Sequence, residues 1–164
     1  MAATDSKDPR FYPPPVFYFS VQIAGFSGAR GKYDNSFQEV SGLDMSFDTE
    51  TIIEGGENRF SHIVPTRRKY SNLVLKRGFI ATGSALGGWC DAILGGDLTV
   101  AITLKNITVR LLAPDGGGDT ALKEWEFEGA YPVRWQLADL DASQNSIAVE
   151  TIEFAYKYFK PVKK

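Results

Sequence analysis

The chain is poor in the residues that build disulfides and metal sites. Its 164 residues include one cysteine, Cys90, and one histidine, His62. A single cysteine excludes a disulfide within the chain and fits synthesis in a reducing compartment. One thiol and one imidazole are too few for a structural zinc site, which takes four such ligands. The sequence therefore predicts no bound metal and no cofactor.

Net charge and long apolar runs are also scarce. The formal net charge is −2, so the chain has no overall basic field to hold nucleic acid. No run approaches the roughly 20 apolar residues that span a bilayer. The segment Met1–Arg10 has no apolar stretch of the kind found in secretory signals. We expect a protein made in the cytoplasm without a signal peptide and without stable insertion into a membrane.

Aromatic residues and glycines, by contrast, are plentiful. Aromatic residues make up 13% of the chain, and 16 residues are glycine, which favours many short strands and tight turns. The length fits one domain. A polar start that ends in Pro13-Pro14-Pro15 cannot join a sheet interior. We expect a flexible proline-rich arm over residues 1–15 and a single domain over residues 16–164.

The clearest strand signal begins at Leu43. From there apolar and polar residues alternate as far as Asp48, which is the period of a β-strand with two different faces, and we expect the strand to run to Glu54. Leu43, Met45 and Phe47 share the apolar face, and we expect that face to cover the core. The polar face carries Asp44, Ser46, Asp48 and Glu50.

Similar alternation and one helical pattern complete the fold prediction. A stripe at i, i+3, i+4 and i+7 predicts a helix over residues 84–94, with Cys90 on its apolar side. A change of phase at residues 105–106 predicts a bulge, and Pro132 places its strand at an edge or a break. The expected strands cover residues 17–23, 43–54, 73–79, 98–104, 107–111, 125–135 and 152–158, with a long loop over residues 55–70. The fold class is mainly β, a β-sandwich or barrel of six or more strands with one packed α-helix.

No set of residues looks catalytic. Cys90 lies on the apolar stripe of the predicted helix, where a buried thiol is inert, and His62 lies in a polar segment. The carboxylates Asp48 and Glu50 recur at period two, as solvated strand faces do. Without a nucleophile and base the chain is not expected to be an enzyme. The cluster Arg67-Arg68-Lys69 is either a solubilising loop tip or a docking site for an acidic neighbour.

Five segments in a fixed order point to a known family. They are Phe17-Tyr18-Phe19-Ser20-Val21 after the proline-rich arm, Phe37-Gln38-Glu39-Val40-Ser41-Gly42-Leu43, Glu54-Gly55-Gly56-Glu57-Asn58, Leu73-Val74-Leu75-Lys76-Arg77-Gly78 and Ile147-Ala148-Val149-Glu150-Thr151-Ile152-Glu153. The resemblance that they carry covers most of the chain from Pro13 to Phe159. The chain resembles the tail-tube (inner tube) proteins of contractile phage tails and extracellular contractile injection systems.

The resemblance implies six copies in a ring, with rings stacked into a hollow tube that a contracting sheath drives through a target envelope. Strands of all subunits would then join into one sheet around the lumen. The lumen-facing candidates are Asp44, Ser46, Asp48, Glu50, Thr151, Glu153 and Lys157. The candidates for the ring-stacking loop are Glu57, Asn58, Arg59, Arg67, Arg68 and Lys69. An acidic lumen stripe over residues 44–50 would repel nucleic acid.

The resemblance also implies partners. They are further copies of the chain, a sheath protein, a baseplate or spike hub, a tube cap, and effector cargo or DNA in the lumen. The particle would be a phage tail or a phage tail-like assembly, either released outside the cell or anchored in it. Two alternatives stay open: a secreted hexameric ring protein of type VI secretion that carries effectors, and a β-barrel that binds a small ligand in an apolar cavity.

Overall fold

The structure is a computed structural model, and it describes residues 18–26, 36–53, 60–96, 101–113, 121–139 and 147–162. Within these ranges the chain forms nine strands and one helix, so the prediction of a mainly β fold with a single helix is confirmed. The elements are β1 (Phe19–Ile23), β2 (Glu39–Ser41), β3 (Met45–Ile52), β4 (His62–Tyr70), β5 (Leu73–Gly78), α1 (Ala85–Leu94), β6 (Lys105–Leu112), β7 (Ala121–Leu137), β8 (Val149–Ala155) and β9 (Tyr158–Val162).

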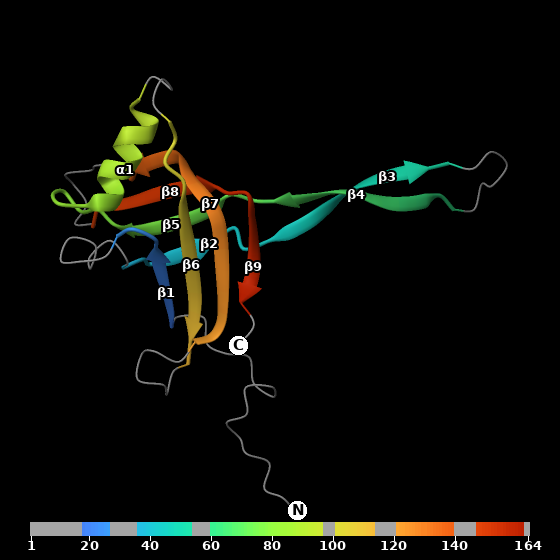
Figure 1. Ribbon diagram of the computed structural model, residues 1–164, viewed down its shortest axis with the longest axis horizontal. Helices are drawn as coiled ribbons and strands as arrows, with labels where there is room; N and C mark the ends of the chain where they lie inside the picture. Colours follow the sequence, from blue (N-terminus) through green and yellow to red (C-terminus); the bar gives the residue numbers. More distant parts are fainter. Residues whose placement is uncertain are drawn as a thin grey trace, which may run out of the picture.

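The long strand β7 joins two sheets. Its first part, residues 121–130, pairs with β6 and β9, and β6 pairs with β1; we call these four strands sheet I. Its second part, residues 131–137, pairs with β8, which continues through β5 to β2; these four strands are sheet II. All these pairs are antiparallel. Figure 1 shows sheet I running down the body while sheet II crosses it. The arrangement is sandwich-like, and the alternative of a closed barrel was wrong for the single chain.

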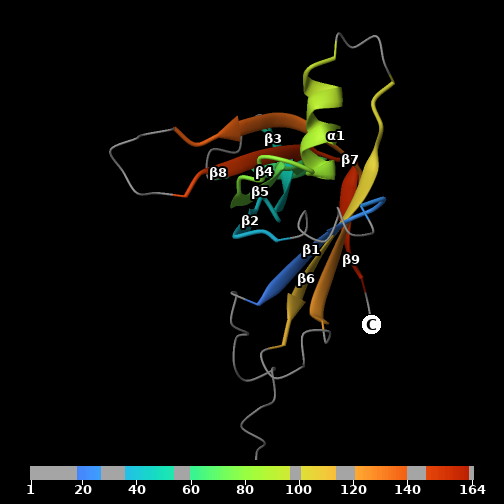
Figure 2. The same cartoon turned by 90° about the vertical axis from the view of Figure 1, so that its left-hand side faces the viewer.

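The core lies between the sheets and the helix. Alternate residues of each strand point inward, as the period of two requires. The fully buried side chains come from both sheets and from α1, and they include Ile23, Leu73, Leu75, Leu86, Ile107, Phe127, Ile152 and Phe154. The helix packs against β7 (Figure 2) and buries Leu86, Trp89 and Cys90, which confirms the predicted stripe. It begins after Ser84, whose Oγ accepts the backbone N–H of Gly87, and ends at Gly95.

Two irregularities fall where the sequence places them. The pairing of β6 with β7 shifts register between Lys105 and Ile107, which confirms the predicted bulge. Opposite it, Gly129 adopts a φ of 64°, a conformation that side chains disfavour. Pro132 lies where β7 leaves β6 and pairs only with β8, and the register shifts again between Pro132 and Arg134. This agrees with the expected edge or break.

Two element predictions were wrong. Residues 101–104 belong to no strand, although Ile102 and Leu104 alternate with polar neighbours; residues 97–100 lie outside the described ranges. The predicted loop over residues 55–70 contains the nine-residue strand β4, which pairs with β3. Strand β4 has no buried face, so the hydrophobic alternation by which strands are recognised is missing from its sequence.

The strands β3 and β4 form an arm that projects from the body of the molecule (Figure 1). Every residue of β3 is exposed, and the side chains of Met45 and Phe47 are each 54% exposed. The expectation that this strand covers the core with its apolar face was therefore wrong within one chain. A period of two shows that a strand has two faces, but it does not show which surface covers them. Of the apolar residues predicted to share that face, only Leu43, before the strand begins, packs against the core.

Candidate assembly surfaces

The outward face of sheet II is a continuous polar surface. Residues directly paired across antiparallel strands point to the same side. Two rows of pairs therefore run across β2, β5, β8 and β7, and they alternate with the core-facing row of Leu75 and Ile152. The rows are Glu39, Lys76, Thr151 and Gln136, and Ser41, Val74, Glu153 and Arg134. We call these eight residues the polar wall.

Ion pairs cross between the strands of the polar wall. The Nζ atom of Lys76 lies 2.9 Å from Oε2 of Glu39, which joins β5 to β2. Nη1 of Arg134 lies 3.1 Å from Oε1 of Glu153, which joins β7 to β8. Nη2 of Arg134 also donates to Oε1 of Gln136 at 2.9 Å. All four charged side chains of the polar wall are thus held in two pairs of opposite sign.

The structure separates the predicted lumen residues into two groups. Thr151 and Glu153 lie on the polar wall. Ser46, Asp48 and Glu50 lie on the arm, and Asp44 lies at its base. Lys157 follows the end of β8, where its backbone N–H donates to the carbonyl oxygen of Glu128. The chain therefore does not bring the seven candidates onto one surface, and their role in a lumen stays a prediction.

Six residues of the polar wall escaped the sequence interpretation: the apolar Val74 and the polar Glu39, Ser41, Lys76, Arg134 and Gln136. The signal that could have found the five polar ones is the set of polar positions that alternate with buried ones on neighbouring strands. Lys76 follows the buried Leu75 in the same way as Glu153 follows Ile152. What the sequence does not give is which strands are neighbours.

Polar contacts fix the base of the arm to the body. Asp44 accepts the backbone N–H of Ser71 at 3.2 Å through Oδ1 and the hydroxyl of Ser71 at 3.0 Å through Oδ2. The phenol of Tyr156 donates to the carbonyl oxygen of Ser71 at 2.8 Å. Burial, and then the nearby Asp44 carboxylate, raise the pKa of Tyr156 to about 12, so this phenol stays a donor at neutral pH.

A glycine sets the direction in which the chain leaves the polar wall for the arm. Gly42 lies between β2 and β3 with a φ of 85°. A Cβ at this position would collide with the backbone carbonyl of Asn72, which lies just before β5. Both the conformation and the close approach require glycine here. The turn that contains Gly42 therefore couples the geometry of the arm to that of sheet II.

The basic cluster lies on the arm. Arg67, Arg68 and Lys69 belong to β4, so the expectation of a loop at this position was wrong. The guanidinium of Arg68 lies 5.4 Å from the ring centre of Phe47, and Nζ of Lys69 lies 3.9 Å from Oδ1 of Asp48. The register of the arm shifts between Phe47 and Thr49, opposite Thr66 and Arg67. The other stacking candidates, Glu57, Asn58 and Arg59, fall outside the described residues.

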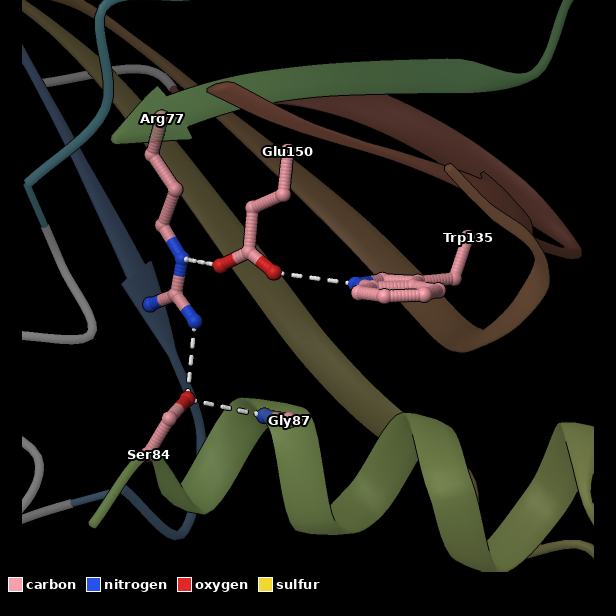
Figure 3. Close-up of polar contacts among 5 residues, drawn as sticks. All are labelled: Arg77, Ser84, Gly87, Trp135 and Glu150. Carbon is pink, nitrogen blue, oxygen red and sulfur yellow. Dashed lines mark hydrogen bonds and ion pairs between the residues drawn. The ribbon is translucent and has the colours of Figure 1, made fainter. Parts of the chain in front are cut away.

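A buried polar network joins sheet II to the helix (Figure 3). Nε of Arg77 donates to Oε1 of Glu150 at 2.5 Å, and Nε1 of Trp135 donates to Oε2 of the same carboxylate at 2.9 Å. Nη2 of Arg77 donates to Oγ of Ser84, the helix cap, at 2.7 Å. Arg77 is 1% and Glu150 2% exposed. Sequence reasoning missed this network, because a charged residue in a strand is usually taken for a solvated one.

The residues considered for chemistry do not meet. Cys90 is buried in α1, and burial, followed by the charge of Glu150, raises the pKa of its thiol to about 12. His62 lies at the start of β4 on the arm, away from the helix (Figure 1). Across the described part of the chain, no group of three His, Cys, Asp or Glu residues could hold a metal ion. No described helix is long and apolar enough to cross a membrane.

A groove of about 480 Å³ opens between the sheets. Its lining is mostly apolar, and it includes Phe19 and Val109 from sheet I, Val40 from β2, and Leu43. Polar groups of Gln38, Glu39 and Arg110 stand at the same groove. The two charged ones already pair within the chain, Glu39 with Lys76 and Arg110 with Glu124, so the groove offers no unpaired charge to orient a small ligand.

The sequence of the chain decides the family. Residues 15–160 match the family model of the T4-like virus tail tube protein gp19. The chain belongs to this tail tube family. No curated protein gives a significant match to it.

Solved structures of tail tube proteins share the fold over nearly the whole chain. The anti-feeding prophage (AFP) baseplate structure contains a chain with 26% identity and a TM-score of 0.78, and the match covers 92% of this chain and 96% of that one. The sheath–tube complex of the extracellular contractile injection system PVC, in its extended state, contains one with 26% identity and a TM-score of 0.77, covering 98% and 99%.

A more distant likeness concerns the alternative family. A type six secretion system protein matches with 15% identity and a TM-score of 0.53, and the match covers 88% of this chain and 82% of that one. This likeness shows a shared fold and nothing more. The tail tube family is the better description, because its members match in both sequence and structure.

Proposed function

We propose that the chain is the structural subunit of the inner tube of a contractile injection system or contractile phage tail. Six copies form a ring, the rings stack into a hollow tube, and a contracting sheath drives the tube through a target envelope. The observation that carries the proposal is the match to the tail tube family over residues 15–160. The likeness to the PVC tube over 98% of the chain supports it.

Ring closure is supported by the two ends of sheet II. Among the described residues, β2 pairs only with β5, and residues 131–137 of β7 pair only with β8. Each end therefore presents unpaired backbone donors and acceptors, a hazard that proteins remove by pairing or cover. Pairing β2 of one copy with β7 of the next is a head-to-tail contact, and such contacts close into rings when the rotation permits. The sheets of all copies then become one.

The polar wall is the face that suits a channel. Sheet I and α1 cover the other side of sheet II, so the apolar rows of β5 and β8 are already buried. The polar wall remains as the surface that water can fill. We therefore assign Thr151 and Glu153, with the six residues of the same rows, to the lumen. Asp44, Ser46, Asp48, Glu50 and Lys157 are not part of this surface.

The arm is suited to contact between copies. A hairpin of two strands is marginally stable in water by itself, and this one exposes Met45, Phe47 and Ile63. Burying those side chains against a neighbouring subunit supplies the stability that the arm lacks. Arg67 and Arg68 on the same arm then meet acidic groups of that subunit. We propose this arm, with residues 57–59 in the segment that connects its strands, as the ring-to-ring contact.

The remaining partners follow from the related assemblies. Related chains occur in structures of a baseplate, a sheath–tube complex and a tube-terminating cap. We propose that this tube likewise contacts a sheath, a baseplate with its spike hub, and a cap, as part of a particle that conducts cargo. Electron microscopy of the purified protein tests the function. Hollow tubes or six-membered rings are expected, and a protein that remains a monomer under every condition would overturn the proposal.

A further inference from the structure

The polar wall carries equal numbers of positive and negative side chains. We propose that Glu39, Lys76, Arg134 and Glu153 keep the channel wall electrically neutral, so that a charged polypeptide of either sign passes without being held. The inference rests on the proposed function, because it takes the polar wall to be the lumen surface. It concerns how the wall treats its cargo, which family membership does not determine.

The polar wall is neutral locally, within each ion pair, as well as in its total charge. Each cation touches its own anion, at 2.9 Å for Lys76 and Glu39 and at 3.1 Å for Arg134 and Glu153. The field of such a close pair falls off more steeply with distance than that of a single charge. At physiological ionic strength, salt screens the remaining field of each pair within a distance of about 8–10 Å. A chain moving along the axis therefore meets no site of net charge on this surface.

The other side chains of the polar wall are uncharged. Ser41, Thr151 and Gln136 offer hydrogen bonds that water can replace at little cost, and Val74 is the one apolar member. None of the eight is aromatic, so nucleic acid bases find nothing on which to stack. Without a surplus of cations the wall also lacks the counterion-releasing contacts that hold phosphates. A nucleic acid is therefore held by this surface no more than a polypeptide is.

The sequence interpretation pointed elsewhere. It placed a negative stripe, residues 44–50, in the lumen, where it would repel nucleic acid and acidic cargo. In the structure those acidic residues lie on the arm and at its base. The balanced wall repels neither sign, and its lack of adhesion depends on keeping both pairs intact.

Assembled tubes test the proposal with two fluorescent probes, a short oligolysine and a short single-stranded oligonucleotide, at low salt. The double variant Lys76→Gln/Arg134→Gln leaves two unpaired carboxylates per subunit in the channel, and Glu39→Gln/Glu153→Gln leaves two unpaired cations. The matched control is Arg110→Gln/Lys160→Gln, which removes the cations of two similar pairs, with Glu124 and Glu126, on sheet I. Each probe is also used coupled to a bead too wide to enter a tube.

Wild-type tubes are expected to retain neither probe. The first variant is expected to retain about tenfold more oligolysine, and the second about tenfold more oligonucleotide, with both effects lost in high salt. Retention should vanish with the bead-coupled probes, whereas any binding by the sheet I control should persist with them. The exchange Glu39→Lys/Lys76→Glu keeps the charge balance and should behave as wild type, which keeps the test open if a double variant fails to fold.

Two results would overturn the proposal without touching the tube function. One is retention of either free probe by wild-type tubes, and the other is equal behaviour of the polar-wall and sheet I variants. If the wild-type chain forms no rings or tubes at all, the proposed function itself is overturned, and this inference with it.

Discussion

Trp135 and Glu150 are joined by a hydrogen bond of 2.9 Å between the indole nitrogen and Oε2 of the carboxylate. The other oxygen of Glu150 binds Arg77, which in turn binds the helix cap Ser84 (Figure 3). Trp135 belongs to the segment of β7 that forms one free end of sheet II. One buried carboxylate thus ties the proposed ring-closing strand to the helix on the far side of the sheet.

The first prediction concerns this network. Arg77→Ala leaves Glu150 buried and unpaired, and loss of one partner of a buried ion pair typically costs about 3–5 kcal/mol. We expect a drop of this order in the free energy of unfolding, measured by urea denaturation. Lys76→Ala, one residue away in an exposed pair, should cost about 1 kcal/mol or less. A double change to apolar residues, Arg77→Met/Glu150→Leu, should recover much of the loss, and equal costs for the two single variants would contradict the prediction.

The second prediction concerns the basic cluster of the arm. Changing Arg67 and Arg68 together to Glu should block stacking of rings while leaving the subunit folded, because both side chains are exposed. Tube length in electron micrographs and the melting temperature of the subunit measure the two effects. Lys123→Glu/Lys160→Glu, with the same change of charge on sheet I, serves as the control. Tubes of normal length from the arm variant would contradict the proposal that Arg67 and Arg68 contribute to the ring-to-ring contact.

The third prediction separates assembly from folding. Met45→Ser/Phe47→Ser removes apolar side chains that are each 54% exposed, so the stability of the isolated subunit should change by no more than about 0.5 kcal/mol. Tube formation should nevertheless be lost, because these side chains are proposed to be buried by a neighbour. Leu94→Ser, at a similarly exposed apolar position on α1, should leave tubes intact. A large loss of subunit stability in the arm variant would show instead that the arm packs against its own chain.

The fourth prediction concerns Cys90. Burial raises the pKa of its thiol from 9.0 to about 12 in the folded state. The folded chain therefore holds this proton at pH values where the unfolded chain releases it. The free energy of unfolding consequently falls as the pH rises from 9 towards 12. Urea denaturation across this range should show the decline, and Cys90→Ala should show a weaker one. At neutral pH a thiol reagent should label Cys90 only after unfolding; rapid labelling of the folded protein would refute the burial.

The sequence predicted the parts of the fold that a buried face determines. The helix, the bulge near Lys105 and the alternation of β5 and β8 all leave apolar residues at a regular period, and each is present. Strand β4 was missed, because Arg67, Arg68 and Lys69 are paired in a strand without any burial. Strand β3, its partner on the arm, is equally exposed and was predicted only because Met45 and Phe47 alternate with polar residues. A strand without such alternation leaves no local signal.

The candidate surface was predicted only in part for a related reason. Thr151 and Glu153 were identified from their own strand, since they alternate with Ile152 and Phe154. Lys76 and Arg134 join them only through the order of strands in sheet II, which brings together residues far apart in the chain. The network of Arg77 and Glu150 shows the same limit: residues 73 positions apart form one ion pair.

The length of β7 has a mechanical consequence. This strand of 17 residues carries backbone pairing to β6 and β9 along one part and to β8 along the other. In the proposed ring, a pull directed along β7 by a neighbouring subunit that pairs with residues 131–137 would load the backbone bonds of both sheets in shear. Many backbone hydrogen bonds must then break at the same time. In a hairpin that is peeled open from its end, by contrast, the bonds break one after another. A tube under thrust gains toughness from a single strand that belongs to both layers.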